Sequence, residues 1–386
     1  MNADGATGEG AGRVAVFTAD AGGGGAERAM LKLAGGLAAE GLAVDLVLTR
    51  ARGHYLPEVP RGIRVVDLRA PRVLASLPGL VGYLRRERPW GMVTSLNHVN
   101  IVGIWARRLA GVSTALVANE QNTLSLETAH SPRRRHRLVP RLARRFYPWA
   151  DAVVAVSQGA AEDLVRVVGI PGERVRVIPN PIVTPELRAR AEEPLEHPWF
   201  GPDRPPVVLA VARCTPQKDL GTLVRAFALV RRERTARLLI LGEGPERPVL
   251  RALADSLGVG ADVDLPGWAR NPYPYMRRAA AYVLSSRWEG LPSVLIEALF
   301  CGCPVIATDC PSGPREILEG GRHGALVPVG DAAALAGAIR EALDGKIPRP
   351  TPASWEPYDQ RTVARRYLEV LRTRGAVPER RSPWRP

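Results

Sequence analysis

Short apolar runs alternate with amphipathic segments in the first half of the chain. Apolar runs of four to seven residues without strict alternation predict strands buried on both faces, as in parallel sheets. The expected strands cover residues 14–18, 43–49, 63–68, 92–95, 115–118 and 152–156, and the expected helices cover 26–40, 77–87 and 101–109. Strands that alternate with helices predict a parallel α/β domain.

The same alternation returns after a proline-rich interval, which we interpret as a domain linker. The expected strands cover 207–211, 237–241, 263–265, 282–284 and 305–307, and the expected helices cover 220–231, 246–257, 294–300, 332–343 and 358–371. Ligands of open parallel sheets bind beyond the carboxyl ends of the strands, so the loops that follow strands should carry the chemistry.

The length of 386 residues exceeds what one core usually supports. We predict two Rossmann-like domains, at 13–182 and 207–350. The remaining parts are a flexible N-terminus at 1–12, the linker at 183–206, a C-terminal helical segment at 351–374 and a basic tail at 375–386.

The net charge of +14 favours an anionic partner, such as a phosphorylated substrate or a membrane surface. Nucleic acid is not expected, because the chain has no zinc-finger spacing, RNA-binding aromatic signature or heptad run. The oligomeric state is left open.

The four cysteines, Cys214, Cys301, Cys303 and Cys310, form no Cys-x-x-Cys pair and have no histidine nearby. This pattern argues against a metal site and favours buried free thiols in a reducing compartment. Residues 1–12 lack the basic and apolar regions of a signal peptide, and the apolar stretch 73–84 is too short to span a bilayer. A cytoplasmic protein, with at most peripheral membrane contact, is expected.

Two carboxylates, Glu289 and Glu297, lie on either side of a turn formed by Gly290, Leu291, Pro292 and Ser293. A helix is expected to begin at this turn, with Ser293 as its N-cap. Amides at a helix start can bind phosphate, and carboxylates can accept hydrogen bonds from sugar hydroxyls. Glu297 could instead be a surface carboxylate favoured by the helix dipole, but its apolar neighbours predict a buried position.

Arg213 and Lys218 follow the first strand of the second domain, where two cations could hold a diphosphate. The alternative is a solvated basic loop. Gly24 and Gly25 belong to a glycine run that opens the first helix, with Glu27 just inside it. That run fits a phosphate or sugar site or a simple tight turn, whereas a nicotinamide site would need an acid after the second strand.

Polar residues also follow two strands of the first domain. They are His98, Asn100, Glu120 and Asn122, and they suit an uncharged polyhydroxyl ligand. His98 is a candidate catalytic residue, and a structural role is the alternative.

Seven arginines accompany an apolar repeat of every fourth residue: Arg133, Arg134, Arg135, Arg137, Arg141, Arg144 and Arg145. This pattern predicts a basic amphipathic helix, suited to anionic lipid headgroups. Pro140 could mark where that helix begins. The alternative is a solvated face whose apolar stripe packs on its own sheet.

Taken together, these motifs resemble the retaining GT-B glycosyltransferases of group 1 (family four) over residues 13–370. Glu289 and Glu297 look like the Glu-seven-residues-Glu motif of the family, and Arg213 and Lys218 match its diphosphate-binding pair. The first-domain loop ending in Gly24, Gly25 and Glu27 is similar to the family's Gly-Gly-Ala-Glu loop. Ala212 and Cys214 depart from the usual residues around Arg213, but neither change removes a charge.

The resemblance implies transfer of a sugar from a nucleoside diphosphate to an acceptor with retention, without a cofactor or an essential metal. Glu289 would face the donor sugar and Glu297 the ribose, with Gly267 and Asn271 near the base. The first domain would bind the acceptor, and the final helix would return to that domain. The expected role is the synthesis of a lipid-linked or cell-surface polysaccharide at the inner membrane face. An epimerase of the same fold or a non-catalytic sugar-nucleotide-binding protein is the alternative.

Overall fold

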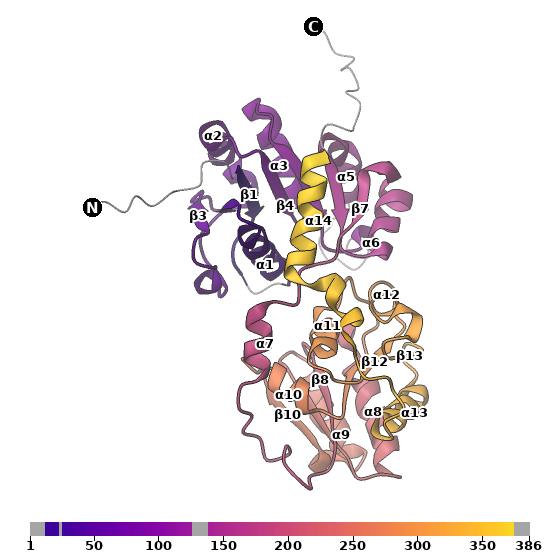
Figure 1. The fold of residues 1–386 in the computed structure, drawn as a ribbon. Helices are drawn as coiled ribbons and strands as arrows, with labels where there is room; N and C mark the ends of the chain where they lie inside the picture. Colours follow the sequence, from indigo (N-terminus) through magenta and orange to yellow (C-terminus); the bar gives the residue numbers. More distant parts are fainter. Residues whose placement is uncertain (1–11, 23–24, 126–137, 374–386) are drawn as a thin grey trace, which may run out of the picture. The chain divides into compact units, whose positions relative to one another are not determined.

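The computed structural model describes residues 12–22, 25–125 and 138–373, and these residues form two compact units. The first unit contains the described residues up to Val156, then Ala160–Pro181, and again those from Gln360 onwards. The second unit contains Ser157–Gly159 and Ile182–Asp359. Each unit has its own parallel sheet, so the predicted fold class of two Rossmann-like domains is confirmed (Figure 1).

The first unit contains a seven-stranded parallel sheet in the order β3-β2-β1-β4-β5-β6-β7. Its strands are β1 (Arg13–Thr18), β2 (Ala43–Leu48), β3 (Arg64–Asp67), β4 (Gly91–Ser95), β5 (Ala115–Glu120), β6 (Ala152–Ala155) and β7 (Val175–Val177). Its α-helices are α1 (Gly25–Ala39), α2 (Leu77–Glu87), α3 (Asn97–Ala110), α5 (Val139–Phe146), α6 (Gln158–Asp163, which belongs to this unit from Ala160) and α14 (Gln360–Arg372). The three-residue β7 was not predicted, because it is too short to show a pattern.

The second unit repeats this topology with six parallel strands in the order β10-β9-β8-β11-β12-β13. Its strands are β8 (Val207–Val211), β9 (Arg237–Leu241), β10 (Val263–Gly267), β11 (Ala281–Leu284), β12 (Val305–Thr308) and β13 (Ala325–Val327). Its α-helices are α7 (Pro185–Ala191), α8 (Leu220–Arg231), α9 (Arg247–Ser256), α10 (Tyr273–Arg278), α11 (Ser293–Phe300), α12 (Pro314–Ile317) and α13 (Ala332–Leu343). The proline-rich interval holds α7, which Thr184 caps by accepting a hydrogen bond from Leu187 N.

The inner strands of each sheet are buried on both faces, as the runs of apolar residues predict, whereas the edge strand β3 is mostly exposed, contrary to the prediction. In β1, Val14 and Val16 pack into one core cluster, whereas Ala15 and Phe17 pack into another on the opposite face. This placement follows from the alternation of side chains along a strand. In the second unit, the neighbouring Val208 and Leu209 of β8 likewise pack into two different core clusters.

Helix α14, the last described helix, packs on α1 within the first unit (yellow in Figure 1). Gln360 Nε2 donates to Lys32 O at 2.7 Å, and Tyr367 is fully buried. The two helices approach closely at Gly36, where a Cβ atom would lie 2.9 Å from the Ala364 Cβ. The first and the last described residues of the chain therefore belong to the same unit.

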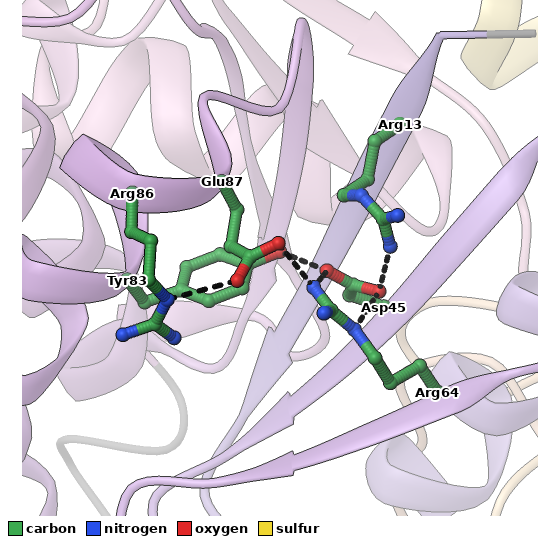
Figure 2. A network of polar contacts seen from close by, with 6 residues as sticks. All are labelled: Arg13, Asp45, Arg64, Tyr83, Arg86 and Glu87. Carbon is green, nitrogen blue, oxygen red and sulfur yellow. Dashed lines mark hydrogen bonds and ion pairs between the residues drawn. The ribbon is translucent and has the colours of Figure 1, made fainter.

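A buried carboxylate ties three strands of the first unit together near their amino ends (Figure 2). Asp45 on β2 is fully buried and accepts hydrogen bonds from Arg13 on β1 at 2.6 Å, from Arg64 on β3, and from the Tyr83 hydroxyl on α2 at 2.7 Å. Burial by itself would raise the pKa of Asp45, but the hydrogen bonds from Arg64 and Tyr83 and the charges of Arg13 and Arg64 outweigh it, so the pKa is lowered. The network lies away from the carboxyl ends of the strands and stabilises the sheet.

Candidate functional site

Strands β8 and β11 are neighbours at the point where the strand order of the second unit reverses. In parallel α/β sheets this point, at the carboxyl ends of the strands, is where ligands bind. The loop after β8 carries Arg213 and Lys218, and the loop after β11 carries Glu289 and Gly290. The topology therefore brings these four predicted site residues to one edge of one sheet.

Lys218 and Glu289 form an ion pair across this edge. Lys218 Nζ lies 2.6 Å from Glu289 Oε1, and the Ser286 hydroxyl donates to the same oxygen at 2.6 Å. The Glu289 side chain is 8% exposed and that of Lys218 is 14% exposed, so water screens the pair only weakly. Arg213, by contrast, is exposed, and no carboxylate of the described residues pairs with it.

Hydrogen bonds join the two loops on both sides of this ion pair. The Gln217 side chain donates to Trp288 O at 2.9 Å, and Arg287 N donates to Gln217 O at 2.8 Å. The Ser285 hydroxyl donates to Lys218 O at 2.7 Å. These contacts fix the backbone on which Lys218 and Glu289 stand.

Glu297 lies on α11, with only 4% of its surface exposed, so the predicted burial is confirmed. Its Oε1 accepts a hydrogen bond of 3.3 Å from the Tyr273 hydroxyl. Burial, and then the charges of Glu289 and Glu297, raise the pKa of Tyr282 on the adjacent strand β11. The expected cap is wrong: Pro292 occupies the N-cap position, Ser293 is the first helical residue, and no side chain caps the helix.

The turn from Gly290 to Pro292 is held by the loop that follows β12. Gly313 has φ of 91°, and a Cβ atom there would lie 2.5 Å from Pro292 Cδ and 2.9 Å from Gly290 O. Only glycine fits this contact. The Thr308 hydroxyl, at the end of β12, donates to Ser286 O at 2.5 Å. The turn at the start of α11, which includes Leu291, is therefore braced from a third strand.

A loop after β9 belongs to this edge, although the prediction missed it. Gly242 and Gly244 have φ of 151° and 155°, and Cβ atoms there would lie 1.8 Å from Ala212 O and 2.3 Å from Cys214 O. Cys214 N donates to Glu243 O at 2.8 Å. The signal was present in the sequence, as two glycines spaced by one residue and followed by proline directly after a predicted strand.

Strand β10 ends at Gly267, and Asn271 lies in the loop that follows it. Gly267 accepts a hydrogen bond from Gly242 N at 2.8 Å, which joins this loop to the one after β9. The Asn271 side chain is engaged with α7 and its flank, since its nitrogen donates to Arg190 O and to Glu193. Packing within the unit thus explains the position of the Asn271 side chain. Its contact with the base of the donor stays a prediction.

The predicted residues of the first unit lie at the carboxyl ends of its strands or just beyond them. Gly25 begins α1 and Glu27 lies in its first turn, whereas Gly24 lies outside the described residues. His98 is exposed in the first turn of α3, and it follows Leu96, whose φ of 81° is unusual for a residue with a side chain. Strain of this kind often accompanies function.

Asn100 and Glu120 were expected in loops, and this expectation is wrong. Asn100 lies on α3 and Glu120 on β5, both almost completely buried. Tyr147 joins them, because its hydroxyl donates to Glu120 Oε2 at 2.7 Å and accepts from Asn100 Nδ2 at 3.0 Å. Strand β5 continues through the polar Asn119 and Glu120, so its predicted end at residue 118 is too early. Asn122, by contrast, is exposed after β5.

The predicted basic helix is α5, and Pro140 lies in its first turn as expected. Arg141, Arg144 and Arg145 belong to this helix. The remaining arginines, Arg133, Arg134, Arg135 and Arg137, lie outside the described residues. Leu138 and Leu142 are 51% and 38% exposed, so part of the apolar stripe faces solvent.

The four cysteines are buried and free, as predicted. Within residues 12–22, 25–125 and 138–373, no group of three His, Cys, Asp or Glu side chains could hold a metal ion. Nor does this part of the chain contain a helix long and apolar enough to cross a membrane.

Comparison with known proteins adds to this geometry. Residues 205–345 match the model of "Glycosyl transferases group 1", and residues 23–186 match that of "Glycosyltransferase Family 4". The chain is 30% identical over 343 residues to N-acetylgalactosamine-N,N'-diacetylbacillosaminyl-diphospho-undecaprenol 4-alpha-N-acetylgalactosaminyltransferase of Campylobacter jejuni, which covers 86% of this chain and 90% of the relative. It is 29% identical to the lipopolysaccharide core biosynthesis glycosyltransferase LpsE of Rhizobium meliloti, over 83% of this chain and 86% of the relative.

Solved structures show the same fold at lower identity. The structure of Anabaena Alr3699/HepE in complex with UDP and glucose superposes with a TM-score of 0.74 at 21% identity, over 94% of this chain and all of that one (100%). The apo form of the lipopolysaccharide outer core galactosyltransferase WaaB has a TM-score of 0.72 at 20% identity, over 94% of this chain and 99% of that one.

Proposed function

Since the chain belongs to the group 1 glycosyltransferases of family 4, we propose that it transfers a sugar from a nucleoside diphosphate sugar to a lipid-linked acceptor, with retention of configuration. That the protein is a GT-B glycosyltransferase follows from its family. The proposal adds the donor class, the acceptor class, the stereochemistry and a transfer that needs neither a metal nor a cofactor.

The observation that carries the donor site is the ion pair of Lys218 and Glu289 at the carboxyl ends of β8 and β11. A diphosphate placed there would meet Lys218 and the exposed Arg213, which no described carboxylate pairs with, together with the first amides of α11. Charge-assisted hydrogen bonds from these groups would stabilise the charge that develops on the leaving diphosphate. These cations support a transfer that needs no metal ion.

The two carboxylates would then have separate tasks. When donor phosphate engages Lys218, Glu289 is released from its cation and can accept hydrogen bonds from hydroxyls of the transferred sugar. Glu297 is held in the interior by Tyr273 and would bind the ribose. Retention rests on the family, and we assign no enzymic nucleophile.

The acceptor class rests on the relatives. The Campylobacter jejuni relative is named for transfer to an undecaprenol diphosphate-linked sugar, and the Rhizobium meliloti relative for lipopolysaccharide core synthesis. The residues proposed for the acceptor are Glu27, His98 and Asn122 of the first unit. Asn100 and Glu120 would act only by positioning their neighbours, because both are buried.

A lipid-linked acceptor requires the enzyme to work at a membrane, and we place the protein at the inner face. Helix α5 supports this, since it carries Arg141, Arg144 and Arg145 beside the exposed Leu138 and Leu142. Basic residues near an anionic membrane contribute about 1 kcal/mol each.

The donor class can be tested by thermal unfolding with UDP, GDP, ADP and their sugars. A ligand at a hundred times its Kd adds about 2.7 kcal/mol of stability, so the correct nucleotide should stand out. The retained configuration is checked by the anomeric proton coupling of the product. If no nucleotide raises the unfolding temperature, the donor proposal is wrong. Turnover of a nucleotide sugar to its epimer without acceptor would favour an epimerase instead.

A further inference from the structure

Two arginines surround one tryptophan at the end of α3. The guanidinium carbon of Arg108, in the last turn of α3, lies 4.7 Å from the ring centroid of Trp149. That of Arg145, near the end of α5, lies 4.8 Å from the same centroid. The Trp149 ring packs edge-to-face on Phe146, with centroids 5.0 Å apart, which holds the indole in place.

Among the residues that the structure describes, no carboxylate pairs with Arg108 or Arg145. The nearby acid, Asp151, is already engaged, because its Oδ2 accepts hydrogen bonds from Arg107 and from Leu116 N. Arg107 also donates to Trp149 O at 2.6 Å. Arg107 therefore has structural partners, whereas no carboxylate of the described residues compensates the charge of Arg108 or Arg145.

A cavity of about 230 Å³ opens beside Arg108 and Trp149, with Arg107 and Asp151 in its wall and Ile104 and Val112 as its apolar part. Arg145 is not part of this lining and adjoins the cavity over the Trp149 ring. A water molecule takes about 30 Å³ in the liquid, so there is room for a polyatomic anion such as a phosphate group. The cavity lies where α3 ends and β6 begins, at the amino ends of the strands. It is thus at the edge of the sheet opposite to the loops that follow the strands of this unit.

Exposed leucines accompany the two arginines along the chain. Leu109 directly follows Arg108 and is 57% exposed, and Leu142, one turn before Arg145, is 38% exposed. A small soluble anion gains no binding energy from apolar side chains. A phospholipid can place its phosphate near the arginines and its acyl chains against the leucines. Tryptophan and arginine together are also typical of the interface between lipid headgroups and acyl chains.

We propose that Arg108, Trp149 and Arg145 form a binding site for the phosphate of an anionic phospholipid headgroup. The site rests on the proposed membrane contact and deepens it. General attraction to an anionic surface needs only basic residues, whereas a headgroup site needs these three side chains in this arrangement.

The test compares two double variants with equal loss of charge in co-sedimentation with vesicles of phosphatidylcholine, with or without phosphatidylglycerol. R108Q/R145Q removes the proposed site, and R141Q/R144Q removes two arginines of α5 but leaves the site. We expect R108Q/R145Q to bind anionic vesicles roughly tenfold more weakly than R141Q/R144Q, because charge-assisted contacts to phosphate are lost. A cooperative unfolding transition at the wild-type temperature verifies that both variants remain folded.

A second measurement uses soluble probes. Dihexanoylphosphatidylglycerol below its micelle concentration should change the tryptophan fluorescence of the wild type but not of Trp149→Phe, and inorganic phosphate should do so more weakly.

Four outcomes decide the matter. A larger effect of R108Q/R145Q, with a lipid response that depends on Trp149, supports the site. Equal weakening by both variants retains the membrane contact but overturns the site. Vesicle binding that ignores lipid charge overturns both. A response to inorganic phosphate as strong as that to the lipid assigns the site to a free anion and overturns the lipid.

Discussion

Lys218 Nζ lies 2.6 Å from Glu289 Oε1, although the two residues are 71 positions apart in the chain. They meet because β8 and β11 are adjacent in the sheet and both strands end at the same edge. In this state the cation proposed for the donor diphosphate neutralises the carboxylate proposed for the donor sugar. Donor binding must therefore redistribute the hydrogen bonds of Lys218. Substitution of Lys218 should mainly weaken diphosphate binding, whereas substitution of Glu289 should mainly lower kcat.

Replacing Lys218 by methionine should weaken binding of a nucleoside diphosphate. Hydrogen bonds to charged groups contribute about 1.5–3 kcal/mol, which corresponds to a loss of roughly tenfold to a hundredfold in affinity. Titration calorimetry with UDP, or with the nucleotide found in the screen, measures this loss. The nucleoside without phosphate should bind the variant and the wild type equally. Lys346→Met, at an exposed position of the same unit, is the matched control.

Glu289→Gln should separate binding from catalysis. The amide has the shape of the carboxylate but not its charge, so Lys218 becomes free for the diphosphate. We expect the diphosphate to bind as tightly as in the wild type or more tightly, whereas kcat falls by at least about a hundredfold, as for the loss of one stabilising group at a reacting centre. A large rise in the Kd of the diphosphate, with kcat unchanged, would contradict both assigned roles.

Glu297→Gln should lower donor affinity through the ribose. The effect should vanish when the nucleotide lacks the ribose hydroxyl that Glu297 binds, so 2′-deoxy and 3′-deoxy nucleotides complete a double-mutant cycle. We expect a loss of roughly tenfold for the ribonucleotide and little for one of the deoxy forms. Unchanged affinity of Glu297→Ala for the ribonucleotide would exclude this role.

The Asp45 network should make the stability of the first unit sensitive to acid. Because the pKa of Asp45 is lowered by folding from its ordinary value of 3.8, its contribution is complete at neutral pH and is lost as the pH falls below about 4. Asp45→Asn should cost about 2–3 kcal/mol at pH 7, less than for a fully buried pair because Arg13 and Arg64 reach solvent. Thermal unfolding between pH 3 and pH 7 measures this.

The matched control for Asp45 is Arg86→Gln, which removes the exposed outer arginine of the same network (Figure 2). Its cost should stay within about 0.5 kcal/mol. If Asp45→Asn keeps the full pH dependence of the wild type below pH 4, another group is responsible for it.

The thiols should be unreactive in the native protein. Burial first, and then nearby carboxylates, raise the pKa of Cys301 and of Cys310 to about 12, and burial also raises the pKa of Cys214. Since the thiolate is the reactive form, an aromatic disulfide reagent at pH 8 should react slowly until the protein is unfolded. Rapid modification of any of the four in the native state would show that its burial is transient.

Much of the fold could be predicted because it depends on local patterns. The strand at Val207–Val211 and the helices at Leu220–Arg231 and Ala332–Leu343 begin and end where the apolar periodicity places them. The predictions failed where the pattern was short or interrupted. The edge strand β13 has only three residues. In β5, the polar Asn119 and Glu120 interrupt the apolar pattern, although both residues belong to the strand.

By itself, the sequence determined the two parallel α/β domains and the residue types of the proposed donor site, because periodicity, glycines and charges near strand ends are readable along the chain. Only the tertiary structure decided which of these groups meet. It paired Lys218 with Glu289, buried Asn100 and Glu120 around Tyr147, and placed Arg108 and Arg145 around Trp149. The physical reason is that strand order, rather than distance along the chain, sets which loops are neighbours, and sheet order is established by packing of the whole domain.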